Sequence, residues 1–361
     1  MKNIIKEALF WCLTTIKADH FFRLINRKRF LILMYHGILK EKTPIACSMV
    51  KKNAFARATD LGLSFNSRQA ETEPSCWWQL PFKKFKWQLE YLKKYYTVMH
   101  LRDVVGKIQR QEHLPDNVAI ITFDDGFENN YSVAYPLLKE LNLPATIFLT
   151  TDFIGKNQML WPDKLFILFF ETEVKEIDLR NFGLNISDLT SKKAKQKAFN
   201  LISNQLKALK LDKKQELISY IESILSKEKT SFSYSDNFKL LSWEQVNFMN
   251  ETGLVHWGAH TCTHEILSQL DDGTLSEEIQ KSCLRISSYG ENLLFAFPNG
   301  RKQDFDERAK VILQRLNVLC SLTTVSGLNS YSQDAYELKR IDVDNNMTRN
   351  RFKLFCSGVF R

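Results

Sequence analysis

The chain of 361 residues lacks any run of about 18 apolar residues, so the sequence predicts no helix that clearly spans a bilayer. It also lacks paired cysteines. Its seven cysteines are scattered and odd in number, which excludes a disulfide framework and favours free thiols in a reducing compartment. No nucleic-acid-binding motif accompanies the formal net charge of +9, so we expect no nucleic acid as a partner. Repeats that would indicate a solenoid are missing too.

The composition is that of a globular protein, with 44% hydrophobic and 25% charged residues. Positive charge concentrates at the N-terminus, where residues 1–30 carry seven Lys or Arg against two acids, a balance of 7 − 2 = +5. Apolar residues recur there at helical spacing: Ile5, Leu9, Cys12, Leu13 and Ile16. Residues 1–29 are therefore predicted to be a basic amphipathic helix. It could dock on the protein, lie on an anionic membrane as a peripheral contact, or be an uncleaved signal, since no small-residue cleavage site follows.

Short apolar runs alternate with helical patterns along most of the chain. The runs predicted as strands are 30–35, 118–123, 146–149, 254–258, 293–297 and 318–323, and the predicted helices include 82–95, 132–141, 242–251 and 276–288. Capping-box spacing supports two helix starts, at Ser242 with Gln245 and at Thr274 with Glu277. Repeated strand–helix units predict an α/β fold, a distorted, TIM-like (β/α) barrel over residues 30–345.

Two regions interrupt this alternation. Residues 40–80 are polar and irregular, with no assigned role. Residues 156–238 are lysine-rich, with apolar residues at helical spacing, and predict a helical insertion that forms a flap beside the site. Residues 346–361 are expected to be a C-terminal tail.

A continuous apolar strand, 118–123, leads directly into Asp124, Asp125 and Gly126. In parallel α/β folds, catalytic residues stand at the carboxyl ends of strands. Adjacent residues leaving a strand point in different directions, so the two carboxylates can serve different partners. A plain Asp-Asp-Gly turn is the alternative.

Two histidines, His260 and His264, follow the apolar segment 254–258. At this spacing they share a face if the segment is helical, and together with one carboxylate they form the ligand set of a catalytic metal site with open positions. The alternative is two unrelated histidines. His36, directly after the first strand, and the segment 295–300 also stand at strand ends.

Several of these segments together resemble the polysaccharide deacetylase family (carbohydrate esterase family 4, the NodB-homology domain). The matching motifs are Thr122–Gly126, Tyr135-Pro136, Leu143–Leu149, Leu241–Val246, His260–His264 and Phe297–Gly300. The resemblance covers roughly residues 30–39, 82–163 and 239–345. It implies a distorted (β/α) barrel and a divalent metal, often zinc.

The resemblance also implies roles. Asp125, His260 and His264 would hold the metal, Asp124 would be the general base, and the backbone N–H of Asn299 would stabilise the oxyanion. The family's C-terminal acid histidine has no counterpart, because no histidine follows His264. Some members that act on exported polysaccharides carry the acid in an N-terminal Tyr-His motif, which makes His36 the candidate.

One further departure concerns the base. Many members place an arginine two positions before the motif proline, Pro298, but this chain has Ala296 there, so the guanidinium that tunes Asp124 is expected to be absent. Pro298 is taken as a residue of the substrate cleft. Asp163 either lines the cleft or starts a helix.

These observations predict a metal-dependent hydrolase that removes N-acetyl groups from an amino sugar in a polysaccharide, oligosaccharide or glycolipid. A membrane-surface enzyme that tailors glycolipids is a variant of this prediction. The alternative is a catalytically silent relative that binds a glycan or a partner protein. Cysteine content and the missing signal favour the cytoplasm, with membrane association, whereas many relatives work outside the membrane. The sugar, the native metal and the oligomeric state stay open.

Overall fold

In the described part of the chain, eight short parallel strands form the central sheet, in the order β10-β1-β5-β6-β7-β8-β9 with β4 also beside β5. Their bounds are β1 Phe30–Tyr35, β4 Thr97–Val98, β5 Val118–Phe123, β6 Ala145–Leu149, β7 Val255–Ala259, β8 Leu294–Ala296, β9 Cys320–Leu322 and β10 Ile341–Asp342. Nearly every residue of these strands is buried, as expected for a parallel sheet covered on both faces. The continuous apolar runs in the sequence have this burial as their cause.

The structure is a computed structural model that describes residues 2–40, 79–184, 188–226, 235–290 and 292–359. The chain divides into two compact units. The barrel unit comprises Ile5–Glu41, Trp77–Gln158 and Asn237–Arg361, and the helical unit contains Met159–Asp236.

A single segment, residues 338–342, links the two ends of the sheet. The Leu338 N–H donates to Ser321 O of β9 (3.1 Å) and the Arg340 N–H to Val325 O (3.0 Å). The next two residues form β10, in register with Leu33 and Met34 of β1. The sheet is therefore curled into the distorted barrel that the sequence predicts.

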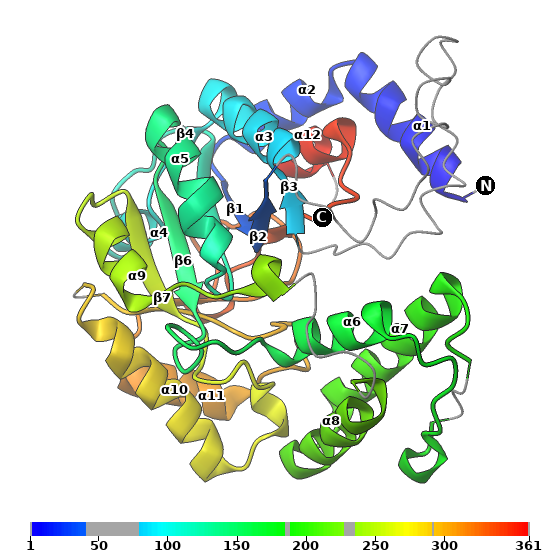
Figure 1. Ribbon diagram of the computed structural model, residues 1–361. Coiled ribbons are helices and arrows are strands. Elements are labelled where there is room, and N and C mark those ends of the chain that lie inside the picture. The colour runs from blue at the N-terminus through cyan, green and yellow to red at the C-terminus, as the bar shows by residue number, and fades with distance from the viewer. Residues whose placement is uncertain (1, 41–78, 185–187, 227–234, 291, 360–361) are drawn as a thin grey trace. The chain divides into compact units, whose positions relative to one another are not determined.

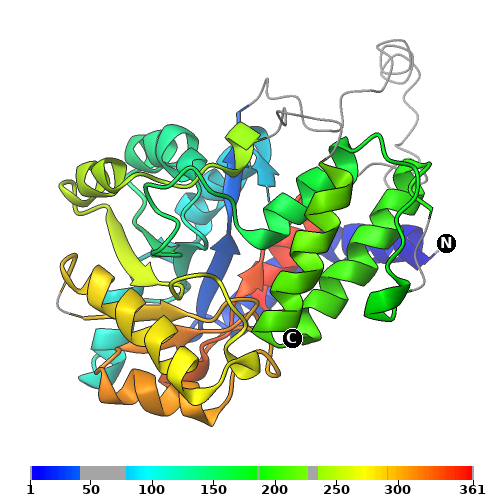
Figure 2. The ribbon, with the colours of Figure 1, turned by 60° about the horizontal axis from the view of Figure 1, so that its bottom comes forward.

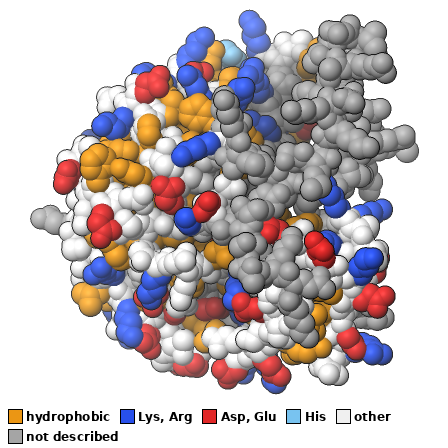
Figure 3. Space-filling view, viewed as in Figure 1, with side chains coloured by type: hydrophobic (Ala, Val, Ile, Leu, Met, Phe, Trp, Pro, Cys, Tyr) orange, Lys and Arg blue, Asp and Glu red, His pale blue; other side chains and the backbone are white. Residues whose placement is uncertain are grey.

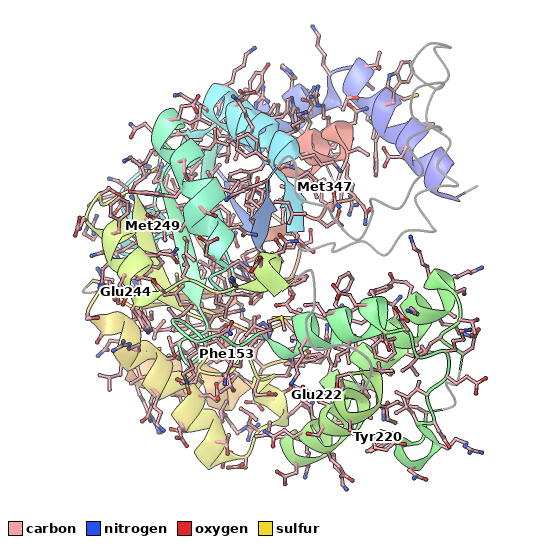
Figure 4. All side chains as sticks on the ribbon, in the orientation of Figure 1. Phe153, Tyr220, Glu222, Glu244, Met249 and Met347 are labelled. Atoms are coloured by element: carbon pink, nitrogen blue, oxygen red, sulfur yellow. The ribbon has the colours of Figure 1, made fainter. Side chains whose placement is uncertain are left out.

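Helices cover the outside of the sheet (Figures 1 and 2). They are α3 Phe82–Tyr95, α4 Leu101–Gln109, α5 Tyr135–Leu141 after a short π-helix at Asn130–Ala134, α9 Trp243–Asn250, α10 Asp272–Ser287 and α11 Glu307–Arg315. Met249 of α9, labelled in Figure 4, is fully buried. A small second sheet pairs β2 (Gly37–Leu39) with β3 (Gln79–Pro81).

The two chain ends of the barrel unit pack together. Helices α1 (Lys2–Thr15) and α2 (Ala18–Ile25) precede β1, and α12 (Arg349–Ser357) lies where the sequence predicts a tail. Asn26, the residue after α2, donates from Nδ2 to Ser357 O of α12 (2.9 Å). Within the described parts of the chain, no helix is long and apolar enough to cross a membrane.

The described residues of the helical unit form three α-helices: α6 Trp161–Glu171, α7 Lys192–Ala208 and α8 Leu211–Leu225. Apolar side chains at helical spacing on α7 and α8 are buried, as the sequence predicts: Ala198, Ile202, Leu206, Leu217, Ile221 and Leu225. Leu209 and Ile218 are only half-buried. Glu222 of α8, also labelled in Figure 4, pairs with Lys164 of α6 at 2.6 Å.

One predicted helix start is wrong and one is confirmed. Ser242 and Gln245 form the capping box at α9. Helix α10 instead begins a turn earlier than predicted, because the Asp271 carboxylate accepts from the N–H groups of Gly273 and Thr274. The aspartate competes better for these N–H groups because it is a charged acceptor at a helix N-terminus. Most of the irregular segment 40–80 lies outside the described residues.

Candidate active site

Asp125, His260 and His264 form a buried cluster at the carboxyl ends of β5 and β7. One ligand atom of each lies within 4.8 Å of the others. The Nε2 atoms of His260 and His264 are 3.5 Å and 3.3 Å from Asp125 Oδ1. Ligand atoms about 2.0–2.1 Å from a tetrahedral ion are roughly 3.4 Å apart, so both separations fit a bound zinc-sized cation.

The carboxylate of Asp125 is buried, so its charged form needs nearby positive charge. Burial acts to raise the pKa of Asp125, but the hydrogen bond and charge of His264 outweigh it and hold the pKa well below its ordinary value. Burial lowers the pKa of His260 to about 4. Asp125 is therefore ionised and His260 neutral at physiological pH, which are the protonation states that a metal ligand requires.

The imidazole of His260 is oriented by the neighbouring strand. Its Nδ1 lies 2.7 Å from Ala296 O of β8. A carbonyl oxygen only accepts, so Nδ1 carries the hydrogen and the Nε2 lone pair faces Asp125. A backbone partner on the remote ring nitrogen commonly fixes the tautomer of metal-binding histidines.

The segment between the two histidines is not helical. The expectation that their side chains share one face depended on a helix at this position, and that helix does not form. Thr261 and His264 both have positive φ, at 63°. The Thr261 Oγ1 accepts from the His264 N–H (3.0 Å), which closes a tight turn. The two imidazole rings lie close together, with centroids 5.1 Å apart, because the chain turns back on itself.

Glu278 of α10 holds this turn from outside, a role that the sequence analysis did not identify. Its carboxylate accepts from the N–H groups of Cys262 (2.8 Å) and Thr263 (2.9 Å) and from Thr263 Oγ1 (2.6 Å). The glutamate is buried on the inner face of its helix. The signal that could have identified Glu278 is an acid at an inward-facing position of a helix.

Gly126 shapes the turn that presents the two aspartates. Its φ is +83°, and a Cβ at this position would lie 2.6 Å from Leu149 Cδ2. Asp125 itself has a positive φ of 73°. The glycine lets the chain turn sharply after β5, so that Asp124 and Asp125 point to different partners.

Asp124 pairs with Arg340, which corrects the expectation drawn from Ala296. The two guanidinium Nη atoms each lie 2.7 Å from one carboxylate oxygen of Asp124. Both side chains are buried, and Arg340 Nε donates to Thr323 O (2.8 Å). The guanidinium expected before Pro298 is supplied instead by the segment that closes the barrel.

This ion pair keeps Asp124 charged. Burial acts to raise the pKa of Asp124, but the charge of Arg340 and, to a smaller extent, of His260 lowers it below its ordinary value. The arginine follows β9 in the sequence and is separated from Asp124 by 216 residues. Its sequence context, after Lys339 and before Ile341 and Asp342, does not distinguish it from an exposed arginine.

His36 follows β1 and lies close to the carboxylates of the site. Its charge acts to lower the pKa of Asp124, Asp125 and Asp342. Asn130 donates from Nδ2 to the backbone oxygen of His36 (2.7 Å), which fixes this strand end. The structure thus brings the proposed acid and the base to the same end of the barrel.

Asn299 and Pro298 occupy a turn after β8. Asn299 has a φ of 57°, and its carbonyl accepts from Thr324 Oγ1 (2.6 Å). Among the residues that the structure describes, no acceptor pairs with the Asn299 N–H. That N–H is available to a ligand, as an oxyanion donor must be.

Asp163 belongs to the helical unit and not to this cluster. It lies in the first turn of α6 and is buried. A place in the substrate cleft therefore stays a prediction.

Comparison with known proteins agrees with this geometry. The family model described as polysaccharide deacetylase matches residues 111–319. A Staphylococcus epidermidis protein named poly-beta-1,6-N-acetyl-D-glucosamine N-deacetylase is 28% identical over 175 residues, 48% of this chain and 58% of that protein. The putative polysaccharide deacetylase YxkH of Bacillus subtilis is 28% identical over 88 residues, 24% of this chain and 32% of that protein. The chain thus matches less than two thirds of either relative.

Two solved structures share the fold. The Streptococcus pyogenes deacetylase PplD, in complex with acetate, superposes with a TM-score of 0.52 at 18% identity, covering 90% of this chain and 96% of its own. IcaB from Ammonifex degensii gives a TM-score of 0.53 at 16% identity, covering 92% and 98%. With a family model that matches more than half of its residues and the motifs assembled at one end of a barrel, the chain belongs to the polysaccharide deacetylase family.

Proposed function

We propose that this chain is a divalent-metal-dependent N-deacetylase that hydrolyses the acetamido group of an amino sugar in a polysaccharide, oligosaccharide or glycolipid. The observation that carries the proposal is the buried Asp125–His260–His264 cluster beside an Asp124 kept ionised by Arg340. The staphylococcal relative is named for action on poly-beta-1,6-N-acetyl-D-glucosamine, which makes that polymer the first substrate to test.

Asp125, His260 and His264 would hold the ion, and zinc suits two imidazoles and one carboxylate. When bound, such an ion supplies Lewis-acid chemistry, which polarises the acetyl carbonyl and lowers the pKa of water. The separations within the cluster and its protonation states support this assignment.

The chain's own side chains would manage the protons. Asp124 takes a proton from the attacking water as the new C–O bond forms, because its carboxylate is ionised and buried beside the cluster. The Asn299 N–H donates to the oxygen of the tetrahedral intermediate. When the C–N bond breaks, His36 gives a proton to the sugar nitrogen, so that the products are acetate and a free amine.

The direct test is acetate release from poly-beta-1,6-N-acetyl-D-glucosamine, N-acetylated chitooligosaccharides and an N-acetylglucosaminyl lipid, with and without a chelator. We expect chelator-sensitive release from at least one of them. Asp124→Asn should retain the metal and lose activity, whereas His260→Ala and His264→Ala should lose both. Turnover by Asp124→Asn would refute the assignment of the base.

The same experiment addresses a silent, glycan-binding relative. A missing guanidinium beside Asp124 would favour that alternative, but Arg340 supplies one. Stoichiometric metal without acetate release from any N-acetylated sugar would favour it over the enzyme.

A further inference from the structure

Exposed apolar side chains gather on α1 and α2. The structure describes ten large hydrophobic side chains as exposed, and six of them lie in the first 25 residues: Leu9, Trp11, Ile16, Phe21, Leu24 and Ile25. We call these six the N-terminal apolar surface. Single exposed apolar residues are normal, but a contiguous group indicates an interaction site.

Helix α2 has its polarity inverted for a helix that covers a domain. Its buried residues are Ala18 and Asp19, while Phe21, Leu24 and Ile25 are each about 60% exposed (61%, 59% and 59%). A surface helix ordinarily turns its apolar stripe toward the core. Here the outward face is the apolar one.

Polar contacts hold α2 in this orientation. Arg23 donates from Nη1 to Tyr91 Oη of α3 (3.3 Å), and its guanidinium lies 4.6 Å from the centre of the Tyr95 ring. Because an arginine and two tyrosines attach the inner face, the outward apolar residues are not needed for packing. Phe21, Leu24 and Ile25 are therefore exposed and available to contact a partner.

The charge around this surface is positive. Residues 7–29 contain five basic and two acidic residues, 5 − 2 = +3. Of the two acids, Asp19 is buried and Glu7 accepts from Thr348 Oγ1 (3.0 Å). Lys17, between the two helices, is exposed.

Further lysine and arginine side chains stand nearby. Arg27 and Lys28 share one carboxylate, Asp116, at 3.5 Å and 2.8 Å, so one positive charge of the group stays uncompensated. Lys94 of α3 is exposed beside Tyr95. Figure 3 shows Lys and Arg side chains gathered over the edge of the molecule where α2 and α3 lie.

We propose that the N-terminal apolar surface docks on the anionic surface of a phospholipid bilayer. Trp11, Phe21 and Leu24 would enter the boundary between headgroups and acyl chains, while the surrounding lysines and arginines face lipid phosphates. An apolar face with a basic rim matches this occupant in both polarity and charge. The contact is peripheral, since no described helix can cross a membrane.

The docking surface contains none of the residues of the candidate active site. Helix α2 leads into the amino end of β1, whereas His36, Asp124 and His260 follow the carboxyl ends of their strands. Membrane contact and acetate release can therefore be changed independently, and failure of one proposal leaves the other standing.

The test is co-sedimentation of the 361-residue chain with vesicles of pure phosphatidylcholine, or of phosphatidylcholine with about 30 mol% phosphatidylglycerol, which gives an anionic surface. The test variant is Trp11→Gln/Phe21→Gln/Leu24→Gln. The control is Phe248→Gln/Leu284→Gln, which removes exposed apolar side chains elsewhere on the barrel unit. All replaced side chains are exposed, so unchanged circular dichroism is expected for both variants.

We expect wild type and control to bind the anionic vesicles, and the triple variant to bind about tenfold or more weakly. Binding to pure phosphatidylcholine should be weak, and rising salt should weaken binding to the anionic vesicles. Equal binding by the triple variant and wild type would overturn the proposal.

Light scattering after gel filtration tests the competing occupant, a second copy of the chain. A wild-type dimer that becomes monomeric in the triple variant, with no vesicle binding by either protein, would assign the surface to self-association and overturn the membrane proposal.

Discussion

The buried pair of Asp124 and Arg340 permits a quantitative prediction. Arg340→Met keeps much of the side-chain volume but leaves the Asp124 carboxylate buried without its bidentate partner. Removing one member of a buried ion pair typically costs about 3–5 kcal/mol, because the remaining charge is uncompensated. At roughly 2–4 °C per kcal/mol for a chain of this size, the melting temperature should fall by roughly 6–20 °C.

The pair also sets a pH dependence. The folded-state pKa of Asp124 lies below its ordinary value of 3.8. The carboxylate therefore contributes stability that is complete above that ordinary value and is lost as the pH falls through the lowered pKa. Without Arg340, burial raises the pKa of Asp124, so the acid limb of the pH–activity profile should move to higher pH in Arg340→Met.

A double-mutant cycle separates the pair from the two single residues. The stability of Arg340→Met, Asp124→Asn and the double variant is measured by urea unfolding, with Arg315→Met as an exposed arginine control. We expect the double variant to recover much of the stability that Arg340→Met loses, because no uncompensated charge remains. If the double variant is as unstable as the sum of the two single variants, the two residues are not coupled and the reasoning is refuted.

Three further predictions concern Glu278 and Gly126, which hold the two turns of the site, and His256 of β7. Glu278→Gln should weaken zinc binding about 10- to 100-fold in a competition titration, because the turn between His260 and His264 loses its charged acceptor. The exposed control, Glu277→Gln, should bind zinc like wild type. Equal affinities for the two variants would show that the turn does not depend on the Glu278 carboxylate. Gly183→Ala, at a positive φ with open space around it, should lower the free energy of unfolding in urea by about 1–2 kcal/mol. Gly126→Ala should lower it by more, because the added methyl group also clashes with Leu149. The reverse order would contradict the contact assigned to Gly126. Burial, and then the neighbouring His100, lower the pKa of His256 to about 3, so the unfolded chain binds the proton more tightly than the folded one. Stability should therefore fall as the pH is lowered from about 6.5 to 3, and it should fall less steeply in His256→Phe. Parallel curves of melting temperature against pH for the two proteins would refute this.

The strands and the meeting of Asp125, His260 and His264 could be predicted because their signals are local. The runs 30–35 and 118–123 are continuous apolar segments, and the structure begins and ends β1 and β5 at those residues. His260 and His264 lie close in sequence, directly after a strand, so their association follows from the chain's direction. The detailed path between them did not follow, because the positive φ of Thr261 and His264 depends on hydrogen bonds that sequence spacing does not encode.

Contacts between distant segments could not be predicted from local sequence patterns. Ala296 indicated a missing guanidinium, yet a buried cation could arrive from any strand that reaches the same end of the barrel. The helix start at Thr274 was wrong for a simpler reason, since two nearby side chains could cap and the charged one, Asp271, does.

Arg340 lies on the segment that closes the barrel, which has a consequence for the order of assembly. Protein synthesis delivers β5 and Asp124 long before residues 338–342 leave the ribosome. Until then β1 lacks its β10 partner and the buried Asp124 has no counter-ion, so a native-like barrel is disfavoured. The last inserted strand thus completes the sheet and compensates the buried charge in a single event, which couples the chemistry of the site to completion of the fold.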